Sequence, residues 1–356
     1  MRLFPIVAGL AAGILFGAAT PLRKALLGSF NGFQLAGLLY LGAAAVFLPK
    51  LALTGRRELA SLRAAGGLKA LAVIVLFGGF RGPVLLLFGL KLAASTSVSI
   101  WLNMELVATA ILGAVFFKDH LDLPAIAGVA LAVAAGALVS FQEGAAGLVP
   151  ALFVTAACFC WGMDNHLTAL VDSASPATVT FVKGAFAGTV NLIIGTLAAD
   201  APVAPRLYLL ALLVGVLSYG ASIVLYVKSA QQLGAVRSQV LFSTAPFWGI
   251  LGAALALGEP VTPFALVAML LVAAGIVLAN ALTHEHRHRH AAALHMHAHS
   301  HDDGHHDHAH DRPLPPGARH SHAHAHEATE HEHKHYPDLH HRHAHGSSAA
   351  AAKPSP

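Results

Sequence analysis

Long apolar segments follow one another along the first 282 residues, and short polar or turn-forming stretches separate them. A helix needs about 20 mostly apolar residues to cross the hydrocarbon core of a bilayer. The pattern therefore predicts an all-α polytopic membrane protein with ten transmembrane helices. We place these helices at residues 3–20, 31–49, 69–90, 95–117, 122–141, 147–170, 176–198, 206–227, 234–257 and 262–282.

The pattern changes completely after residue 282. Of the 25 histidines in the chain, 23 lie between His284 and His345, where they alternate with small or charged residues. This segment has few apolar side chains to bury, and several prolines interrupt it. We therefore expect residues 283–356 to form a disordered His-rich tail.

The composition supports a membrane protein. Hydrophobic residues make up 56% of the chain and charged residues 11%, whereas soluble domains carry about 25% charged residues. The basic residues form no patch interleaved with aromatic residues, so we expect no nucleic-acid partner. No Ser/His/Asp arrangement or phosphate-binding loop is present. We therefore expect a protein that is not an enzyme and requires no cofactor.

The distribution of Lys and Arg predicts the orientation, because cytoplasmic loops are enriched in these residues. The longest loop carries five of them, and placing it in the cytoplasm puts nine basic residues inside and four outside. The inner set is Arg2, Lys50, Arg56, Arg57, Arg63, Lys69, Lys118, Lys228 and Arg237, and the outer set is Arg23, Lys24, Lys91 and Arg206. Ten spans then place both termini in the cytoplasm, with the protein in the inner (plasma) membrane.

The two halves of the apolar region repeat each other. The segment "FFKDHLDLPAIAGVALAVAAGALVS" at 116–140 matches "ALGEPVTPFALVAMLLVAAGIVLAN" at 256–280. Each half contains five predicted spans, and duplication of an odd number of spans inverts the second copy in the membrane. We therefore predict two inverted five-helix repeats, residues 1–141 and 142–282, with a site between them. Glycines at 9, 13 and 17 predict a close packing seam on the first helix.

These features resemble a known family. The 5+5 duplication, the turns in "FKDHLDLPAIAGVALAVAAG" and "LGEPVTPFALVAMLLVAAG", and "STAPFWGILGA" resemble the EamA type of the drug/metabolite transporter superfamily. "CWGMDNHLT" and "HKHYPDLHHRHAH" further resemble a bacterial subgroup with His-rich C-terminal tails. The resemblance implies ten helices, a cavity lined by the third and fourth helices, and transport of a small molecule across the lipid bilayer, often by export.

Four charged residues fall inside predicted spans, where charges are costly and usually mark a pathway or a buried pair. We predict that Arg81 pairs with Glu105 near mid-depth in the first half, and that Asp164 can pair with Lys183 in the second. Either the pairs border the substrate cavity, or they only hold helices together. Glu105 and Asp164 are the candidates for proton coupling.

Polar and aromatic residues on the helices expected to line the cavity form a second group of candidates. Their side chains can hydrogen-bond or stack on a substrate, or they can serve packing alone. They are Trp101, Asn103, Asn165, Tyr219 and Ser243.

The tail suggests metal binding, because imidazoles at alternate positions suit Zn²⁺, Ni²⁺ and Co²⁺. The most concentrated candidates are His331, His333, His335, His340, His341, His343 and His345. Such binding can feed a metal exporter, buffer or regulate an organic carrier, or have no role in transport.

We therefore expect a secondary transporter that works by alternating access and exports an organic metabolite or drug. One alternative is a divalent transition-metal efflux carrier that uses the tail to collect ions. The other is a membrane-tethered metal-binding or sensing module.

Overall fold

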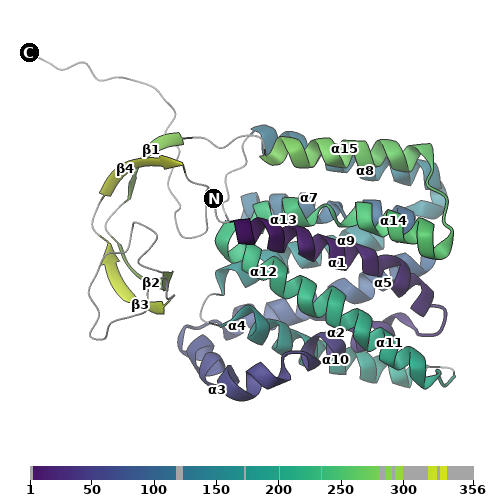
Figure 1. Ribbon diagram of the computed structural model, residues 1–356, viewed down its shortest axis with the longest axis horizontal. Coiled ribbons are helices and arrows are strands. Elements are labelled where there is room, and N and C mark those ends of the chain that lie inside the picture. Colours follow the sequence, from purple (N-terminus) through teal and green to yellow (C-terminus); the bar gives the residue numbers. More distant parts are fainter. Residues whose placement is uncertain are drawn as a thin grey trace, which may run out of the picture. The chain divides into compact units, whose positions relative to one another are not determined.

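The protein is described here by a computed structural model, in which the chain divides into a helical unit, residues 1–282, and a tail unit, residues 283–356. Placement is described for residues 3–117, 123–171, 174–199, 201–233, 235–280, 285–290, 293–299, 320–326 and 329–334. Within these ranges the helical unit is built entirely from helices packed side by side (Figure 1). Its elements are α1 (Leu3–Leu26), α2 (Gly32–Ala45), α3 (Leu48–Ala64), α4 (Leu68–Ile74), η1 (Val75–Arg81), α5 (Gly82–Leu92), α6 (Ser95–Trp101), α7 (Met104–Leu112), η2 (Gly113–Phe117), α8 (Leu123–Glu143), α9 (Ala145–Leu170), α10 (Pro176–Leu197), α11 (Pro205–Gly215), η3 (Val216–Ala221), α12 (Ser222–Leu233), α13 (Ala235–Phe242), α14 (Ala245–Leu257) and α15 (Pro263–Asn280).

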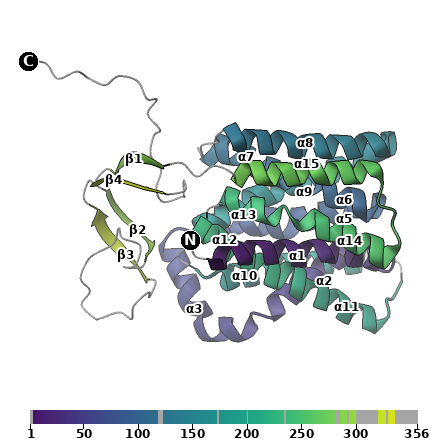
Figure 2. The ribbon, with the colours of Figure 1, turned by 45° about the horizontal axis from the view of Figure 1, so that its top comes forward.

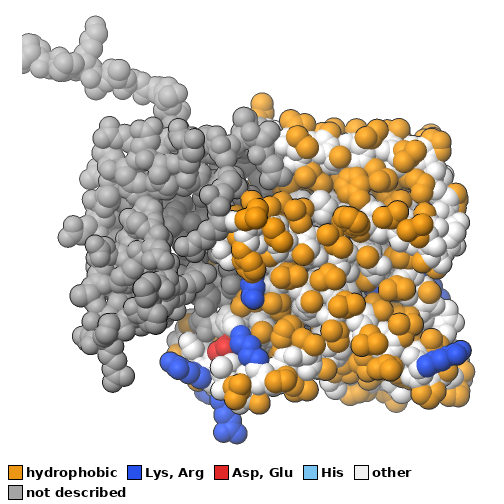
Figure 3. All heavy atoms as spheres, viewed as in Figure 1, with side chains coloured by type: hydrophobic (Ala, Val, Ile, Leu, Met, Phe, Trp, Pro, Cys, Tyr) orange, Lys and Arg blue, Asp and Glu red, His pale blue; other side chains and the backbone are white. Residues whose placement is uncertain are grey.

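Every predicted span corresponds to a helix or to a run of consecutive helices. Among the described residues, eight of these are long and apolar enough to cross a membrane. The two others are shorter: α2 has 14 residues, and the apolar part of α15 is Pro263–Leu278. Hydrophobic side chains cover most of the visible face of the helical unit, and Lys and Arg side chains lie at its edges (Figure 3). A surface of this kind suits contact with lipid tails.

The second span differs from the prediction. It was expected to run to residue 49, but α2 ends at Ala45, and the chain bends by 79° into α3. The residues expected to form a loop are helical in α3. Charged residues from Lys50 onward are costly in hydrocarbon, so the chain leaves the direction of α2 before it reaches them.

A carboxylate attaches α3 to the bundle. The backbone N–H of Ser175, the N-cap residue of α10, donates to Glu58 Oε2 at 2.8 Å, and the Thr54 hydroxyl donates to Oε1 at 2.9 Å. Burial raises the pKa of Glu58, but hydrogen bonds from Thr178, Ser175 and Thr54 outweigh burial and lower the pKa to about 2. The carboxylate therefore stays charged as a fixed acceptor for the start of α10.

Contacts between helices follow the repeat. The second span packs on the seventh (α2 on α10), and the fifth packs on the tenth (α8 on α15). In both views α8 and α15 lie together at one edge of the helical unit (Figures 1 and 2). The first span contacts α12 and α14, and its counterpart α9 contacts α5, α6 and α7. The contacts of the first span therefore have equivalents in those of the sixth.

Irregular turns also occur at matching places. The third and eighth spans contain the π-helical segments η1 and η3. The fourth span is broken between α6 and α7 at Leu102 and Asn103, and the ninth is broken between α13 and α14 at Ser243 and Thr244. π-Turns and broken helices inside membrane proteins line protein cavities, because lipid cannot satisfy their backbone groups. The two π-helical segments and the two helix breaks therefore indicate where a cavity is expected.

The glycine seam on α1 is confirmed. A Cβ atom on Gly17 would lie 2.0 Å from the carbonyl oxygen of Ala245, and one on Gly13 would lie 3.0 Å from that of Phe242. Glycine allows α1 of the first half to approach the broken ninth span of the second half at backbone distance.

The tail was expected to lack regular structure, yet its described stretches are strands. β1 (Glu285–His290) pairs antiparallel with β4 (Thr329–Lys334), and β2 (Ala293–His299) pairs antiparallel with β3 (His320–His326). The alternation of His with other residues in these stretches matches the two-residue period of a strand.

The seam gives the first testable prediction. Gly17→Ala should destabilise the protein by about 1–3 kcal/mol, because a methyl group would collide with backbone that cannot move aside freely. The thermal unfolding midpoint in detergent measures this effect. Gly136→Ala is the matched control, since its nearest neighbour would be Met104 Sδ at an ordinary 3.5 Å. An unchanged midpoint for Gly17→Ala would contradict the packing described.

Candidate functional site

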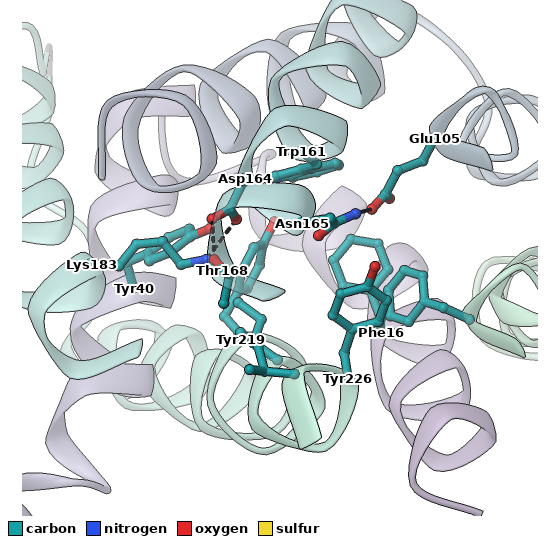
Figure 4. A pocket seen from close by; sticks show the side chains of 13 residues that line it. Phe16, Tyr40, Glu105, Trp161, Asp164, Asn165, Thr168, Lys183, Tyr219 and Tyr226 are labelled. Atoms are coloured by element: carbon teal, nitrogen blue, oxygen red, sulfur yellow. Dashed lines mark hydrogen bonds and ion pairs between the residues drawn. The ribbon is translucent and has the colours of Figure 1, made fainter. Parts of the chain in front are cut away.

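A cavity lies between the two halves of the helical unit (Figure 4). Its empty space, together with the open solvent at its mouth, is about 480 Å³. Its walls combine several aromatic rings with a few buried charged or amide groups. The lining residues are Phe16, Tyr40, Glu105, Trp161, Asp164, Asn165, Thr168, Lys183, Tyr219, Ile223, Tyr226, Val227 and Phe242.

A buried ion pair forms one side of this cavity. Lys183 Nζ of α10 lies 2.7 Å from Asp164 Oδ2 of α9, and the Thr168 hydroxyl donates to Asp164 Oδ1 at 3.0 Å. Asp164 and Lys183 are only 5% and 2% exposed. Thr168 follows Asp164 by one helical turn, so both side chains share a face of α9. The predicted pair is therefore present, and each charge is compensated by the other.

The second carboxylate, that of Glu105 on α7, has a different environment. It is 5% exposed and accepts a hydrogen bond of 2.9 Å from the Asn165 amide, which also donates to Gln239 Oε1 at 3.2 Å. The amide nitrogen thus links the first-half helix α7 to α13 in the second half. Among the residues whose placement is described, no Lys, Arg or His side chain forms an ion pair with Glu105.

Aromatic rings close the cavity around these groups. The ring of Phe16 lies 5.8 Å from that of Trp161, 5.8 Å from that of Tyr219 and 5.2 Å from that of Phe242, measured between centroids. The first two contacts are edge-on and the third is tilted, and such arrangements are favourable for packed aromatic rings. The aromatic residues come from α1, α9, η3 and α13, so opening this part of the cavity requires the two halves to move apart.

The π-turn η1 supplies a backbone acceptor to this wall. Gly82 N–H donates to Phe77 O instead of Gly78 O, and Pro83 has no N–H to offer. The free carbonyl of Gly78 accepts from the Tyr40 hydroxyl at 2.5 Å and from the Trp161 indole at 3.2 Å. The local sequence "GGFRGP" thus fixes two cavity side chains.

Arg23 lies behind the aromatic wall and not in the outer loop where we expected it. Helix α1 continues to Leu26, and Arg23 is fully buried. Its guanidinium lies 4.3 Å from the Phe16 ring centroid and donates to the Tyr219 hydroxyl at 3.1 Å. The remaining bonds go to the carbonyl oxygens of Phe16 and Ala19 and to the Thr20 hydroxyl. This side chain ties α1 to η3.

Five of the nine predicted pathway residues line the cavity: Glu105, Asp164, Asn165, Lys183 and Tyr219. Arg81 does not, and its predicted pair with Glu105 is absent. Arg81 is exposed, and its guanidinium lies 5.3 Å from the Phe77 ring centroid. The π-turn that ends at Arg81 shifts the positions around it from the α-helical register on which the prediction relied.

The other three predicted residues are buried outside the cavity lining. Trp101 donates from its indole nitrogen to the Ser140 hydroxyl at 2.9 Å, which indicates a packing role. Asn103 and Ser243 stand at the two corresponding helix breaks. The Asn103 amide donates to Ile100 O at 3.1 Å, and the Ser243 hydroxyl donates to Gln239 O at 2.8 Å. Both side chains therefore satisfy backbone carbonyls at the breaks.

Sequence reasoning missed most of the aromatic wall. Phe16, Tyr40, Trp161, Tyr226 and Phe242 look like ordinary residues of apolar spans. Two of these residues could have been found from their spacing in the sequence. Trp161 precedes the predicted residue Asp164 by three positions, and Tyr226 follows the predicted residue Tyr219 by seven, and both spacings place side chains on one face of a helix.

The predicted metal ligands of the tail are only partly within the described residues. His331 and His333 belong to β4 and stand opposite His288 and His286 in the β1–β4 register. His335, His340, His341, His343 and His345 lie outside the described residues. Among the described residues, no group of three or more His, Cys, Asp or Glu is placed to hold a metal ion.

Two repeats of five spans, broken helices and a charged cavity between the halves define a membrane transporter of small molecules. The EamA-like transporter family model matches residues 3–141 and 148–281, so both repeats are covered. The chain belongs to the EamA-like transporter family.

One further comparison agrees with this assignment, and a second agrees with the fold. An uncharacterized transporter of Methanothermobacter thermautotrophicus (strain Delta H) is 26% identical over an alignment of 279 residues, and the match covers 73% of this chain and 81% of the relative. One solved structure, described only as a crystal structure of a protein, is similar with a TM-score of 0.58 at 16% identity. The match covers 79% of this chain and 98% of that one, and it supports the fold alone.

The ion pair gives the second prediction. Asp164→Asn or Lys183→Met alone should destabilise the protein by about 3–5 kcal/mol, because each leaves a buried charge without its partner. The double variant should recover most of this loss, since no unpaired charge remains. Thermal unfolding of the four proteins in detergent tests the cycle. Losses that simply add in the double variant would show that the two groups do not interact.

Proposed function

We propose that this protein is a secondary carrier that exports a small organic molecule, a metabolite or a drug, by alternating access. The observation that carries the proposal is the cavity between the repeats, whose walls contain six aromatic residues, the Asp164–Lys183 pair and Glu105. Aromatic surface with a few buried polar groups is typical of sites for organic molecules.

The fold supports a rocking mechanism. Inverted repeats can exchange conformations, and each exchange moves the cavity opening from one side of the membrane to the other. The Phe16–Tyr219 contact and the Arg23–Tyr219 hydrogen bond join α1 to η3 across the two halves. In this account they form part of the barrier that must separate when the cavity opens to the opposite side.

The proposed orientation assigns the α3 end of the cavity to the cytoplasm. Lys50, Arg56, Arg57 and Arg63 all lie on α3, and the excess of basic residues favours the cytoplasm for this end of the protein. Both termini then lie in the cytoplasm of a cell with the protein in its plasma membrane. Export carries substrate from the α3 end of the cavity to the other side.

Metal binding by the tail is a separate proposal. Alternating histidines, and the register that sets His295 opposite His324 and His297 opposite His322, support binding of Zn²⁺, Ni²⁺ or Co²⁺. We propose that the tail buffers metal or regulates an organic carrier, and that it is not needed for each transport cycle.

The third prediction tests these proposals in cells. Cells that express the wild type should release at least one small organic solute faster than cells that express Glu105→Gln or Lys183→Met, because the variants lack a charged group of the cavity. Mass spectrometry of the medium, at equal expression of each protein, identifies that solute.

Two variants serve as controls. Glu143→Gln changes a carboxylate outside the cavity, and truncation after Asn280 removes the tail. Both should release the solute at the wild-type rate. Equal release by wild type and Glu105→Gln would contradict the carrier proposal. Flux of ⁶³Ni²⁺ or ⁶⁵Zn²⁺ into proteoliposomes that depends on both Glu105 and the tail would support metal efflux instead.

A further inference from the structure

We propose that the substrate is an organic cation, and that Glu105 binds its positively charged nitrogen against the rings of Phe16, Tyr226 and Phe242. This inference rests on the proposed function, since it names the substrate class of that same cavity. It follows from the balance of buried charge, from the arrangement of the rings, and from one hydroxyl group without a partner.

The charge balance distinguishes the two carboxylates. Asp164 is neutralised by Lys183 at 2.7 Å, so this pair adds no net charge to the cavity. Among the residues that the structure describes, Glu105 accepts a hydrogen bond from the neutral amide of Asn165 at 2.9 Å and forms no ion pair. A carboxylate removed from water is costly unless it is protonated or paired with a cation. Among the described residues no cation pairs with Glu105, so a cationic substrate can supply the positive charge that a deprotonated Glu105 needs.

Arg23 does not supply that group. Its guanidinium lies on the far side of the aromatic wall, over Phe16 and bonded to the Tyr219 hydroxyl, and Arg23 is not among the residues that line the cavity. Its other hydrogen bonds point to α1, at Ala19, Phe16 and Thr20. The two rings thus separate its charge from the cavity.

Aromatic rings face the place where the cation would lie. The Phe242 ring is 5.2 Å from that of Phe16 and 5.4 Å from that of Tyr226, so rings from α1, α12 and α13 form one cluster. Figure 4 shows Glu105 and Asn165 on one side of the cavity, with Phe16 and Tyr226 on the other. Aromatic faces attract cations, with about 2 kcal/mol or more when water is excluded.

Tyr226 provides the second polar group. Its side chain is 6% exposed, its hydroxyl points into the cavity, and that hydroxyl has no hydrogen-bond partner among the described residues. A buried hydroxyl without a partner is unfavourable. An ammonium group between Glu105 and Tyr226 would donate to both oxygens and satisfy them together.

The experiment uses three probes of similar size and different charge: 2-phenylethylammonium, phenylacetamide and phenylacetate. Isothermal titration calorimetry measures their binding to the full chain in nanodiscs. The cation should bind roughly tenfold or more tightly than the neutral amide, and the anion should bind least. Glu105→Gln should weaken binding of the cation at least about tenfold and leave the affinity for phenylacetamide unchanged.

Further variants keep the test decisive. Tyr226→Phe should weaken binding of the cation a few-fold because the ring remains and the hydroxyl is lost. Glu143→Gln should bind the cation like the wild type. Glu105→Asp keeps the charge, so it should retain part of the affinity and shows whether Glu105→Gln fails through charge or through misfolding.

Several outcomes would overturn the inference. These are equal affinity of wild type and Glu105→Gln for the cation, tighter binding of phenylacetate, or no binding of the cation at millimolar concentration. The transport experiment is independent of this one. Export of a neutral or anionic solute would contradict the cationic substrate but support the carrier function. Binding of the cation without any transport would contradict the carrier function but support the cation site.

Discussion

The exclusion of water from the bilayer core is the constraint on which this structure depends. Every backbone and side-chain polar group at that depth needs a partner inside the protein. The π-turn at η1 leaves the carbonyl of Gly78 free, and the Tyr40 and Trp161 side chains satisfy it. At the two breaks, Ile100 O and Gln239 O each accept a backbone N–H and a second hydrogen bond from the side chain of Asn103 or Ser243. At η1 and at the two breaks the irregular backbone is therefore enclosed by protein, whereas Val115 and Phe116 of the third π-helical segment, η2, are exposed.

The same constraint distinguishes the buried charged groups by how far each charge is compensated. Asp164 and Lys183 compensate each other, and Arg23 is held by carbonyls, hydroxyls and rings. Among the described residues, Glu105 has an amide partner but no cation. The Tyr226 hydroxyl of the same cavity has no hydrogen-bond partner among these residues either, so the two groups together are suited to bind and release a ligand. Glycines such as Gly17 approach the backbone of the opposite half closely. The two halves can therefore pack tightly against each other beside the cavity.

Much of the fold could be predicted because hydrophobic length and the 116–140/256–280 repeat reflect constraints that act on every residue of a span. The Asp164–Lys183 pair could be predicted for the same reason, since helical spacing and depth bring the two together. Predictions failed where a helix changed its register or ended at another residue than expected. The π-turn displaced Arg81, charge ended α2 early, and the extension of α1 buried Arg23. The aromatic wall was missed because a ring that lines a cavity and a ring that faces lipid look alike in sequence.

The central claim is that one cavity opens alternately to the two sides of the membrane, and thiol labelling tests it most directly. Tyr226→Cys, in a background with Cys158→Ala and Cys160→Ala, places a single thiol in the cavity wall. A membrane-impermeant maleimide is then applied to intact cells and to inverted vesicles, and the rate of labelling is measured from each side. The account predicts labelling from both sides, with substrate changing the two rates in opposite directions. Labelling from one side alone, unaffected by substrate, would contradict it.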